Sequence, residues 1–217
     1  MSIVNDSQKV AGLLLESGAV SFRPEKPYRW ASGMLSPVYC DNRLILSDPK
    51  ARDAMIKFME GLIHSKKINF ETMAGVAMAG IPHAAILADR LGKPLIYVRA
   101  SAKDHGKGNK IEGRLARGDR VLVVEDLVST GGSSLSVVEA IRSSGGKVAD
   151  CLAVFSYGFP FAANAFKRAR CQLHALTGLD VLLNIAIKTK KLDPASKRVI
   201  EEFRCNPRQW SDRLKGG

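Results

Sequence analysis

Hydrophobic residues in the first third of the chain recur at helical spacing, with an irregular stretch between two such segments. An amphipathic helix is predicted over about the first 20 residues, ending near Gly18, with an apolar face that includes Val10, Leu13 and Leu14. A second helix is predicted over residues 49–64, with an inward face of Ala54, Met55, Phe58, Leu62 and Ile63. The intervening residues 28–46 mix apolar positions with turn formers, which predicts short strands and turns.

Further along the chain, short apolar runs alternate with amphipathic segments. The apolar runs predict strands over residues 72–78, 94–99, 120–124, 148–157 and 174–176. Helices are expected over residues 82–91, 135–143 and 194–204, and the polar, basic residues 100–118 predict a long loop. Strands separated by helices of this length imply an α/β fold, with a parallel sheet flanked by helices on both faces.

Composition fits a globular protein and adds a strong positive charge. Apolar residues make up 46% and charged residues 25% of the chain. The formal net charge is 33 − 21 = +12, which implies anionic partners. Such a partner is either a nucleic acid, whose backbone the charge would neutralise, or a small polyphosphate held by a few converging basic residues. Composition alone does not choose between the two.

The cysteines and the apolar runs indicate the cellular compartment of the protein. Cys40, Cys151, Cys171 and Cys205 show no Cys-x-x-Cys spacing and no accompanying histidine cluster, so neither a zinc site nor a redox pair is expected. This usage favours a reducing compartment, and we expect a cytoplasmic protein. No apolar run approaches the roughly 20 residues that cross a bilayer. Glu16 directly follows the first apolar run, which favours a helix face over a signal peptide.

One segment combines an apolar strand, two acids, small hydroxylic residues and two glycines. It spans residues 121–134 and reads VLVVEDLVSTGGSS. The loop after a parallel strand lies at the strand's carboxyl end, where open α/β sheets bind ligands. Small residues from Ser129 to Ser133 would expose backbone N–H groups, and the following helix would add partial positive charge. The segment therefore predicts a cradle for a phosphate monoester, to which serine and threonine hydroxyls can add donors.

Glu125 and Asp126 stand beside this predicted phosphate site, which needs an explanation. Acids fit there if the phosphate belongs to a sugar, because carboxylates accept hydrogen bonds from ribose hydroxyls and can orient Mg²⁺ through water. The alternative is a strand end followed by an ordinary helix N-cap, which Asp and Ser often supply. The acidic pair, hydroxyl run and double glycine together favour the sugar-phosphate site. The segment is neither a Walker motif nor Gly-x-Gly-x-x-Gly.

A second candidate segment is basic and contains several glycines. From Arg99 to Arg120 there are seven basic and three acidic residues, a local excess of 7 − 3 = +4. Arg99 can bind a diphosphate through two parallel hydrogen bonds, and Lys103 adds a point charge. His105 can donate to a phosphate oxygen or move a proton. A solvated surface loop and a nucleic-acid patch are the alternatives. The glycines and the lack of an aromatic residue for base stacking favour a hinged lid over a polyphosphate.

These motifs resemble those of a known family. VVEDLVSTGGS, residues 123–133, resembles the signature of type I phosphoribosyltransferases, which bind 5-phosphoribosyl 1-diphosphate. KDHGKGN, residues 103–109, resembles the catalytic loop of orotate phosphoribosyltransferases in particular. Residues 32–43 resemble that family's hood strand, which packs against the base, and residues 75–84 resemble its diphosphate-contacting turn. The resemblance extends from about residue 8 to Trp210 and covers nearly the whole chain.

The resemblance implies both an activity and an organisation. The activity is transfer of the 5-phosphoribosyl group from 5-phosphoribosyl 1-diphosphate to orotate, with Mg²⁺, giving orotidine 5′-phosphate and diphosphate for pyrimidine biosynthesis. The organisation is a single phosphoribosyltransferase domain over residues 1–217, with a hood formed mainly by about residues 1–45 and by contributions from the C-terminal part. A homodimer with shared active sites is also implied.

The motifs and the resemblance together assign site residues. The expected catalytic residues are Lys103, His105 and Asp126. Binding of the donor is expected from Arg99, Lys103, His105, Glu125, Asp126, Leu127, Val128, Ser129, Thr130, Gly131, Gly132 and Ser133. Ser129 is also expected to contact orotate. No residue is expected to bind the metal directly, because Mg²⁺ would be held mainly by substrate and water near Asp126.

The chain also departs from some members of the family. Ala31, Ala79 and Ala100 stand where some members carry active-site lysines. An arginine that touches orotate in some members is absent near residues 156–158. Ser129 is therefore the one orotate contact that we transfer to this chain.

Two alternatives stay open on the sequence alone. A phosphoribosyltransferase for another base would share the phosphate loop, although residues 32–43 and 103–109 argue against it. A donor-sensing regulator that binds nucleic acid would use the net charge, through a basic face of Lys188, Lys190, Lys191, Lys197, Arg198 and Arg204. Against a regulator, neither a helix-turn-helix nor an aromatic-basic motif is evident. Packing or surface roles are expected for His64, His174, Trp30 and Trp210.

Overall fold

The computed structural model describes residues 3–30, 32–99 and 110–215. Its strands are β1 (Val20–Phe22), β2 (Tyr28–Arg29), β3 (Leu35–Ser36), β4 (Val38–Cys40), β5 (Thr72–Val76), β6 (Leu95–Val98), β7 (Ile111–Glu112), β8 (Arg120–Val128), β9 (Lys147–Ser156) and β10 (Gln172–Gly178). Its helices are α1 (Ile3–Glu16), the 3-10 helix η1 (Asn42–Ser47), α2 (Pro49–Ser65), α3 (Gly80–Leu91), α4 (Gly132–Ser143), α5 (Pro160–Arg168), α6 (Leu179–Lys188), α7 (Pro194–Cys205) and α8 (Pro207–Lys215).

Six strands form the central sheet, in the order β10-β9-β8-β5-β6-β7. Neighbouring strands run parallel, except for the antiparallel pair β6 and β7. At the centre of the sheet Val123 of β8 is level with Ala74 of β5 on one side and with Cys151 of β9 on the other. This arrangement confirms the predicted class, a mainly parallel sheet flanked by helices.

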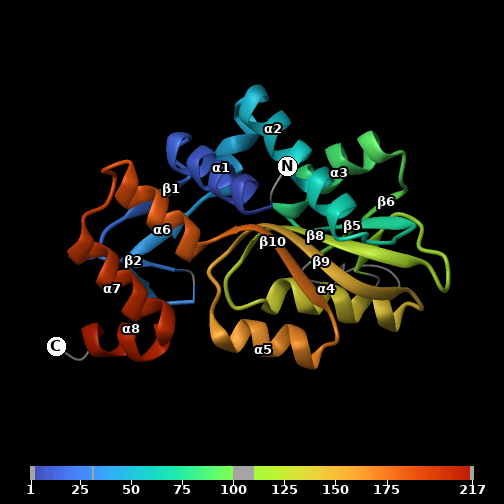
Figure 1. Cartoon of the computed structure of the whole chain (residues 1–217). Helices are drawn as coiled ribbons and strands as arrows, with labels where there is room; N and C mark the ends of the chain where they lie inside the picture. The colour runs from blue at the N-terminus through green and yellow to red at the C-terminus, as the bar shows by residue number, and fades with distance from the viewer. Residues whose placement is uncertain (1–2, 31, 100–109, 216–217) are drawn as a thin grey trace.

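Helices cover both faces of the sheet, as Figure 1 shows, with α1, α2 and α3 above it and α4 and α5 below it in this view. The strands are apolar on both sides for that reason. Leu122 and Val124 of β8 belong to the larger core beneath α1, α2 and α3, whereas Val121 and Val123 belong to the core against α4 and α5. Alternate residues of one strand therefore serve two separate cores.

Helix boundaries follow the capping residues that the sequence provides. Asp48 accepts hydrogen bonds from two backbone amides in the first turn of α2, at 2.8 and 3.2 Å, and Pro49 opens that helix. Asp193 caps α7 in the same way. Beyond the end of α1, Gly18 adopts φ +71°, a conformation that suits glycine. The helices predicted near these residues are confirmed.

The strand β8 is longer than the predicted strand over residues 120–124, which changes the place of the two acids. It continues to Val128 because its last two residues pair with the end of β9. Glu125 and Asp126 therefore lie within the strand, and the prediction that the strand ends before them was wrong. Pairing with a neighbouring strand is a tertiary effect that overrides the local polar pattern.

A short strand also lies inside the predicted loop 100–118. Ile111 of β7 is level with Val98 of β6, and both side chains are buried. The antiparallel pairing places a strand of 2 residues within the predicted loop, so the prediction of an unbroken loop was wrong there, whereas residues 113–118 form neither helix nor strand, as predicted. The remaining residues 100–109 lie outside the described residues, and the loop predicted there stays a prediction.

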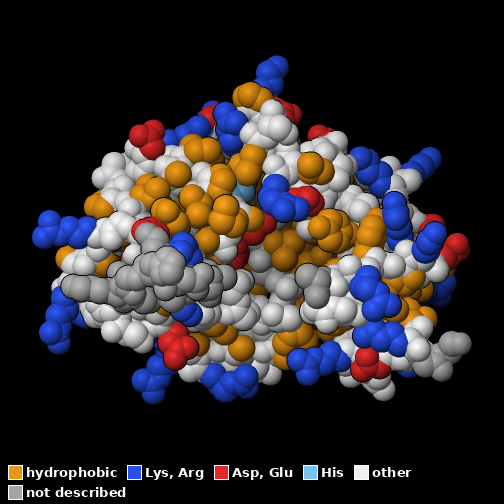
Figure 2. All heavy atoms as spheres, turned by 180° about the vertical axis from the view of Figure 1, so that it is seen from behind, with side chains coloured by type: hydrophobic (Ala, Val, Ile, Leu, Met, Phe, Trp, Pro, Cys, Tyr) orange, Lys and Arg blue, Asp and Glu red, His pale blue; other side chains and the backbone are white. Residues whose placement is uncertain are grey.

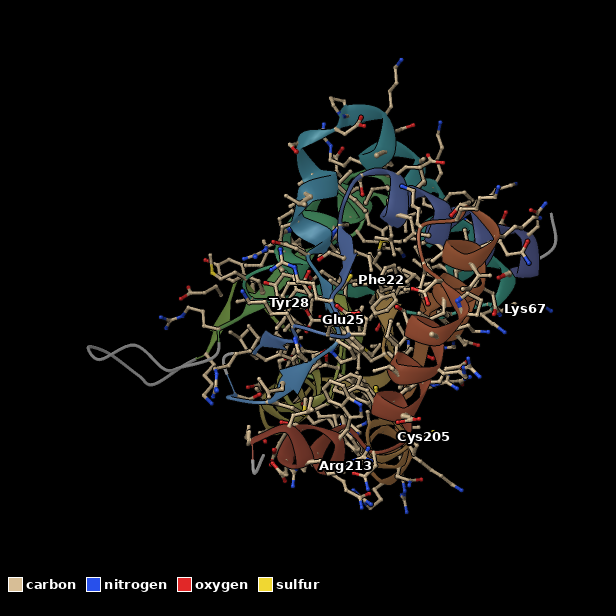
Figure 3. The ribbon with its side chains drawn as sticks, turned by 90° about the vertical axis from the view of Figure 1, so that its left-hand side faces the viewer. Phe22, Glu25, Tyr28, Lys67, Cys205 and Arg213 are labelled. Carbon is tan, nitrogen blue, oxygen red and sulfur yellow. The ribbon has the colours of Figure 1, made fainter. Side chains whose placement is uncertain are left out.

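The strands outside the central sheet lie against the C-terminal helices. β1 pairs with β4, and β2 pairs with β3. The backbone amide of Leu35 in β3 donates to the Ser211 hydroxyl of α8 at 2.9 Å, which joins the two ends of the chain. Figure 3 faces this side of the molecule, where Tyr28 of β2 is labelled together with Cys205 and Arg213 of α7 and α8.

Aromatic rings fill the space between these strands and helices. Trp30 contacts Tyr157 and Phe203 edge-on, with ring centroids 5.1 and 6.1 Å apart. Trp210 contacts Phe203 in the same geometry at 5.4 Å. The packing role expected for both tryptophans is confirmed.

His174 and His64 have the packed and surface positions expected of them. His174 is buried, with its Nε2 atom 2.7 Å from the Asp150 carboxylate, and His64 is exposed. All four cysteines are free thiols. Across residues 3–30, 32–99 and 110–215, no helix combines the length and the apolar character that a membrane crossing requires.

Candidate active site

A cavity of about 370 Å³ lies where the carboxyl ends of β5 and β8 meet. Its lining residues come from β4, η1, the β5–α3 turn, the end of β8 and the start of α4: Tyr39, Cys40, Asp41, Arg43, Val76, Ala77, Met78, Ala79, Glu125, Asp126, Leu127, Ser129 and Ser133. Ligands of open α/β sheets bind at this edge. Figure 2, which views the molecule from behind, shows acidic and basic side chains meeting in a hollow near the middle of that face.

The turn between β8 and α4 has the form of an anion cradle. It contains Gly131, which adopts φ +80°. A Cβ atom on Gly131 would lie 2.8 Å from the Phe166 ring, so both the backbone conformation and the available space require glycine. α4 then begins at Gly132 with no side-chain cap. The Gly132 amide makes only a long hydrogen bond, of 3.5 Å, to the Thr130 hydroxyl. The backbone N–H groups of this first turn can therefore bind an anion, which the helix dipole also attracts.

Glu125 is buried beneath the first turn of α4 and is only 4% exposed. One of its carboxylate oxygens accepts hydrogen bonds from the hydroxyls of Ser133 and Ser134, at 3.2 and 3.1 Å. The other accepts from the Asp126 backbone amide at 3.2 Å. Burial, with the neighbouring Asp126 carboxyl, raises the pKa of Glu125 to about 8. The side chain is thus able to hold a proton near neutral pH.

Asp126 is half-buried and lines the cavity beside Glu125. Its backbone carbonyl accepts a hydrogen bond from the Asn42 side chain at 2.7 Å, which ties β8 to η1. Burial raises the pKa of the Asp126 carboxyl, while hydrogen bonding with Glu125 and the positive charge of Arg43 act in the opposite direction. Arg43 itself binds both carboxylate oxygens of Asp41, at 2.6 and 2.7 Å.

The turn from β5 to α3 forms another wall of the cavity. The Ala77–Met78 peptide bond in this turn is cis, and Met78 is 81% exposed. A Cβ atom on Gly80 would lie 2.5 Å from the Val124 carbonyl oxygen, so α3 begins directly against the backbone of β8. This close approach places the start of α3 beside the end of the strand that carries the acids.

His83 belongs to the segment that resembles a diphosphate-contacting turn, but it lies in the first turns of α3 and is fully buried. Neither ring nitrogen has a hydrogen-bond partner among the residues that the structure describes. Burial lowers the pKa of His83 to about 4, so the ring is neutral at physiological pH. The side chain does not line the cavity.

Most of the predicted donor-binding residues come together at this cavity. Those that line it are Glu125, Asp126, Leu127, Ser129 and Ser133. Those that complete the same strand and turn are Val128, Thr130, Gly131 and Gly132. The Val128 side chain is buried in the core beneath α4, so only its backbone could contact a ligand.

None of the three predicted cationic residues is seen at this cavity: Arg99 lies away from its lining, and Lys103 and His105 lie outside the described residues. Arg99 follows β6, and its Nε atom is 3.1 Å from the Glu112 carboxylate of β7. It is not among the residues lining the cavity. Lys103 and His105 fall within residues 100–109, outside the described residues, so their predicted roles stay predictions.

The sequence did not single out as site residues four that line the cavity, or a fifth that bonds to the Asp126 backbone behind it: Tyr39, Cys40, Asp41 and Arg43, and Asn42. Cys40 was otherwise considered only for disulfide and metal spacing, and the others occurred only within residues 32–43, the segment that resembles a hood strand. Asn42 reaches Asp126 across 84 positions of the chain, and no local pattern marks such a contact.

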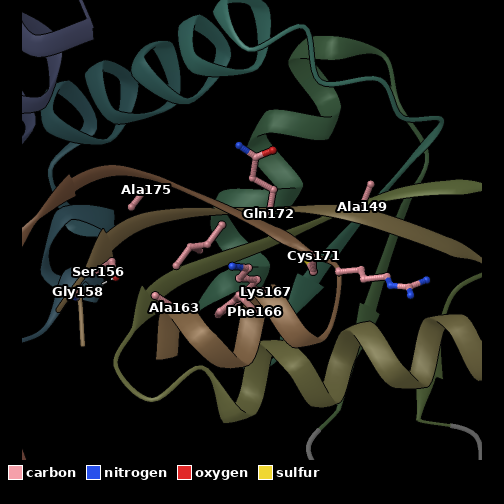
Figure 4. Close-up of a pocket in the computed structure, with 11 residues that line it drawn as sticks. Ala149, Ser156, Gly158, Ala163, Phe166, Lys167, Cys171, Gln172 and Ala175 are labelled. Atoms are coloured by element: carbon pink, nitrogen blue, oxygen red, sulfur yellow. Dashed lines mark hydrogen bonds between the residues drawn. The ribbon is translucent and has the colours of Figure 1, made fainter. Parts of the chain in front are cut away.

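Another hollow, of about 730 Å³, lies between β9, β10 and α5 (Figure 4). Mainly apolar side chains line it, together with Lys167, Arg170 and Gln172. Of the described residues around it, none is a carboxylate that could accept hydrogen bonds from sugar hydroxyls. We therefore place the candidate site in the cavity at the end of β8.

The chain is similar to proteins of known function. Residues 43–171 match the family model of the phosphoribosyl transferase domain. The orotate phosphoribosyltransferase of Coxiella burnetii is 46% identical over 207 residues, which cover 95% of this chain and 99% of that protein.

Solved structures of orotate phosphoribosyltransferases are also similar to this chain. The crystal structure of orotate phosphoribosyltransferase from Aeropyrum pernix has a TM-score of 0.73 at 32% identity, covering 85% of this chain and 99% of that one. The Mycobacterium tuberculosis H37Rv orotate phosphoribosyltransferase, in complex with 5-phospho-alpha-D-ribosyl 1-diphosphate, has a TM-score of 0.63 at 25% identity, covering 82% of this chain and 98% of that one. Because residues 43–171 match the family model and the relatives named above are similar over most of their length, the chain belongs to the phosphoribosyltransferase family and, within it, to the orotate phosphoribosyltransferases.

Proposed function

We propose that the chain transfers the 5-phosphoribosyl group from 5-phosphoribosyl 1-diphosphate to orotate, giving orotidine 5′-phosphate and diphosphate in pyrimidine biosynthesis. One observation carries this proposal: an acid pair and an uncapped helix start share one cavity at the carboxyl end of β8. A phosphate cradle alone would suit many ligands, but acids beside it suit a sugar phosphate with free hydroxyls. Membership of the family supports the same reaction.

The donor is expected to bind with its 5-phosphate on residues 129–133, the turn and the first residues of α4, where backbone N–H groups and the helix dipole favour an anion. Asp126 then accepts hydrogen bonds from the ribose hydroxyls, because it is half-buried and lines the cavity. Glu125 also lines the cavity, but its carboxylate already accepts bonds from two serine hydroxyls. We therefore expect Glu125 to hold the turn in place as well as to contact the sugar.

During transfer, the bond between the anomeric carbon and a diphosphate oxygen breaks, and N1 of orotate bonds to that carbon with inversion and gives up its proton, which passes to solvent or to the departing diphosphate. Positive charge develops on the ribose ring and negative charge on the departing diphosphate. Asp126 stabilises the ring, and the cationic residues Arg99, Lys103 and His105 stabilise the diphosphate, which Lys103 or His105 can also protonate. Holding both reactants in line lowers the barrier by several kcal/mol without a covalent bond to the protein.

Mg²⁺ is the ion that we expect to accompany the donor. Glu125 and Asp126 present carboxylate oxygens, the kind of ligand that Mg²⁺ prefers. Among the side chains that the structure describes, no group of three or more His, Cys, Asp or Glu residues could hold a metal. We therefore expect substrate oxygens and water near Asp126 to hold most of the ion. When bound, Mg²⁺ offsets negative charge on the diphosphate.

The charges of the residues that line the cavity bear on whether two copies of the chain act together as a homodimer. Of the described residues lining it, Arg43 alone is cationic, and Asp41 already binds its guanidinium. A diphosphate therefore needs further positive charge, and we expect Arg99, Lys103 and His105 to supply it across a homodimer with shared active sites. We also place the protein in the cytoplasm, since free thiols suit a reducing compartment.

A panel of free bases tests the proposed reaction. The protein is incubated with the donor and Mg²⁺ plus orotate, uracil, adenine or hypoxanthine, and diphosphate release is followed. Diphosphate should appear only with orotate, at a rate of roughly 1 s⁻¹ or more per site, and should stop when Mg²⁺ is chelated. Turnover with a different base, and not with orotate, would assign the cavity to another phosphoribosyltransferase.

A further inference from the structure

A smaller cavity of about 250 Å³ adjoins the cavity at the end of β8. The larger of the two, in which we expect 5-phosphoribosyl 1-diphosphate to bind, is called the donor cavity below. The two share four lining residues, Tyr39, Cys40, Leu127 and Ser129, so they lie side by side. The residues lining only the smaller cavity, and not the donor cavity, are Arg29, Trp30 and Tyr157. A base bound there would meet a sugar bound at the acid pair.

The walls of this smaller cavity suit a flat ring. Trp30 and Tyr157 contribute aromatic surface and hold each other edge-on, with centroids 5.1 Å apart. Tyr39 adds a third ring, which Tyr28 supports at a centroid distance of 5.4 Å. Aromatic surfaces bind planar heterocycles by stacking and by edge contacts. The shape does not by itself distinguish one base from another.

Arg29 is the only charged residue among the described residues that line this cavity. It has no ion pair or hydrogen bond through its guanidinium to any part of the chain that the structure describes. Neighbouring arginines differ: Arg43 binds Asp41, and Arg23 lies over the Tyr28 ring at 4.9 Å. The guanidinium of Arg29 is therefore available for an anionic group on a ligand.

The backbone holds Arg29 at this position. Arg29 lies in β2, level with Leu35 of β3, and the Leu35 amide donates to Ser211 of α8. The adjoining turn is closed by two further backbone bonds, from Trp30 to Met34 at 2.9 Å and from Gly33 to Trp30 at 2.8 Å. A guanidinium on such an anchored hairpin loses less freedom on binding than one on a free loop.

We propose that Arg29 is the specificity-determining residue that pairs with the carboxylate of the pyrimidine base. This inference rests on the proposed function. The carboxylate is what separates orotate from uracil, and a guanidinium binds it through two parallel hydrogen bonds. The end of β9, at Ser156, Tyr157 and Gly158, offers no charged side chain for this task. The cation thus comes from the N-terminal strand β2.

Product binding separates this role from a general effect on the fold or on the donor site. Orotidine 5′-phosphate and UMP share the sugar phosphate and differ by the carboxylate, so titration calorimetry with both isolates that group. We expect the wild-type protein to prefer orotidine 5′-phosphate. Arg29→Gln should weaken that affinity by about 10- to 100-fold, as loss of a charge-assisted pair predicts, and change the affinity for UMP less than about twofold.

Two further variants sharpen the test. Arg29→Lys keeps the positive charge but lacks the two parallel N–H donors of a guanidinium. Compared with Arg29→Gln, it should recover part of the preference for orotidine 5′-phosphate over UMP. Lys26→Gln removes an exposed cation from the same segment, away from the lining, and should leave both affinities unchanged. Circular dichroism of each variant checks that the fold is retained.

Two outcomes would overturn the proposal, and they can be told apart. If the wild-type protein turns over orotate and Arg29→Gln keeps the wild-type ratio of the two affinities, Arg29 does not read the carboxylate, although the proposed function stands. If the wild-type protein neither turns over orotate nor prefers orotidine 5′-phosphate to UMP, the proposed function fails together with this inference.

Discussion

At the scale of single residues, the two adjacent acids of β8 have different surroundings. Glu125 is buried and accepts hydrogen bonds from Ser133 and Ser134, whereas Asp126 is half-buried in the cavity. Two neighbouring carboxyls in a poorly solvated place do not both ionise easily, because burial and like charge each disfavour the ionised form. The pair is therefore suited to ligands that bring positive charge or hydrogen-bond donors.

A pH titration of stability tests the burial of Glu125. Its pKa is raised from 4.5 to about 8, so between these values the folded protein binds more protons there than the unfolded chain. The free energy of unfolding then falls as the pH rises through this window. Glu125→Gln keeps an oxygen for the two serines but cannot ionise. We expect urea unfolding to show the variant gaining roughly 1–3 kcal/mol over the wild type between pH 5 and pH 8.

The matched control is Glu139→Gln, which changes an exposed glutamate on α4. Its difference from the wild type should stay constant across the same pH range. If the Glu125→Gln curve also runs parallel to that of the wild type, Glu125 does not titrate within this window, and the burial argument is wrong.

The sequence indicated some of these residues and could not indicate others. The acids, the hydroxyl run and the double glycine are contiguous, so one local motif predicted the turn that the structure shows. Arg29 and Asn42 carry no comparable signal, because they matter through contacts with residues far along the chain. Their placement depends on how the N-terminal strands pack, which only the folded chain determines.

At the scale of elements, the turn from β8 to α4 is the feature on which donor binding depends. The start of α4 lacks a side-chain cap, and Gly131 sets its direction with a positive φ. The Phe166 ring of α5 fills the space next to Gly131. The glycine therefore couples the phosphate turn to the packing of α5 against the sheet.

Gly131→Ala should consequently destabilise the protein. The added methyl group would meet Phe166 at 2.8 Å, on a backbone with φ +80°. Crowding and backbone strain together should lower the free energy of unfolding by about 1–4 kcal/mol. The measurement is urea denaturation followed by circular dichroism.

Gly61→Ala provides the matched control, with the opposite sign. Gly61 lies within α2, and nothing stands within 4 Å of an added Cβ atom. Alanine there should raise the free energy of unfolding by about 0.5–1 kcal/mol. Equal stability of the wild type and Gly131→Ala would mean that the turn does not need glycine.

The elements themselves were largely predictable from periodicity, with two informative exceptions. Long amphipathic helices such as α2 and α7 begin at Asp-Pro caps, which the sequence displays. The extension of β8 and the short strand β7 depend on pairing with β9 and β6. A strand's length is set by its neighbours, and a single sequence does not contain that information in local form.

At the scale of the whole molecule, the N-terminal strands and the C-terminal helices close one end of the sheet. The bond from Leu35 to Ser211 and the rings around Phe203 join segments from opposite ends of the chain. The alternating pattern after residue 70 predicted the parallel sheet, but no periodicity indicated this closure. It positions both cavities next to β8.

Subunit mixing tests the proposed sharing of active sites. Lys103→Ala should lower kcat by orders of magnitude, and so should Asp126→Asn. If Lys103 acts in its partner's cavity, half of the sites in a mixed dimer contain neither change. Equimolar refolding of the two variants together should restore about a quarter of the wild-type activity, as random pairing into C2 dimers requires.

Separately refolded variants serve as the baseline for that experiment. Restored activity would also require the wild-type protein to sediment as a dimer. Activity that stays at the level of the separate variants, in a protein that does form mixed dimers, would place Lys103 in the cavity of its own subunit or outside the mechanism.

Donor binding to Asp126→Asn tests the central claim most directly. Calorimetric titration of 5-phosphoribosyl 1-diphosphate with Mg²⁺ into the wild type should give one site per chain. The variant should fold normally and bind the donor at least about tenfold more weakly, because an amide accepts the ribose hydroxyls less well than a carboxylate does. Unchanged donor affinity in a folded variant would contradict the claim that the end of β8 binds the sugar phosphate.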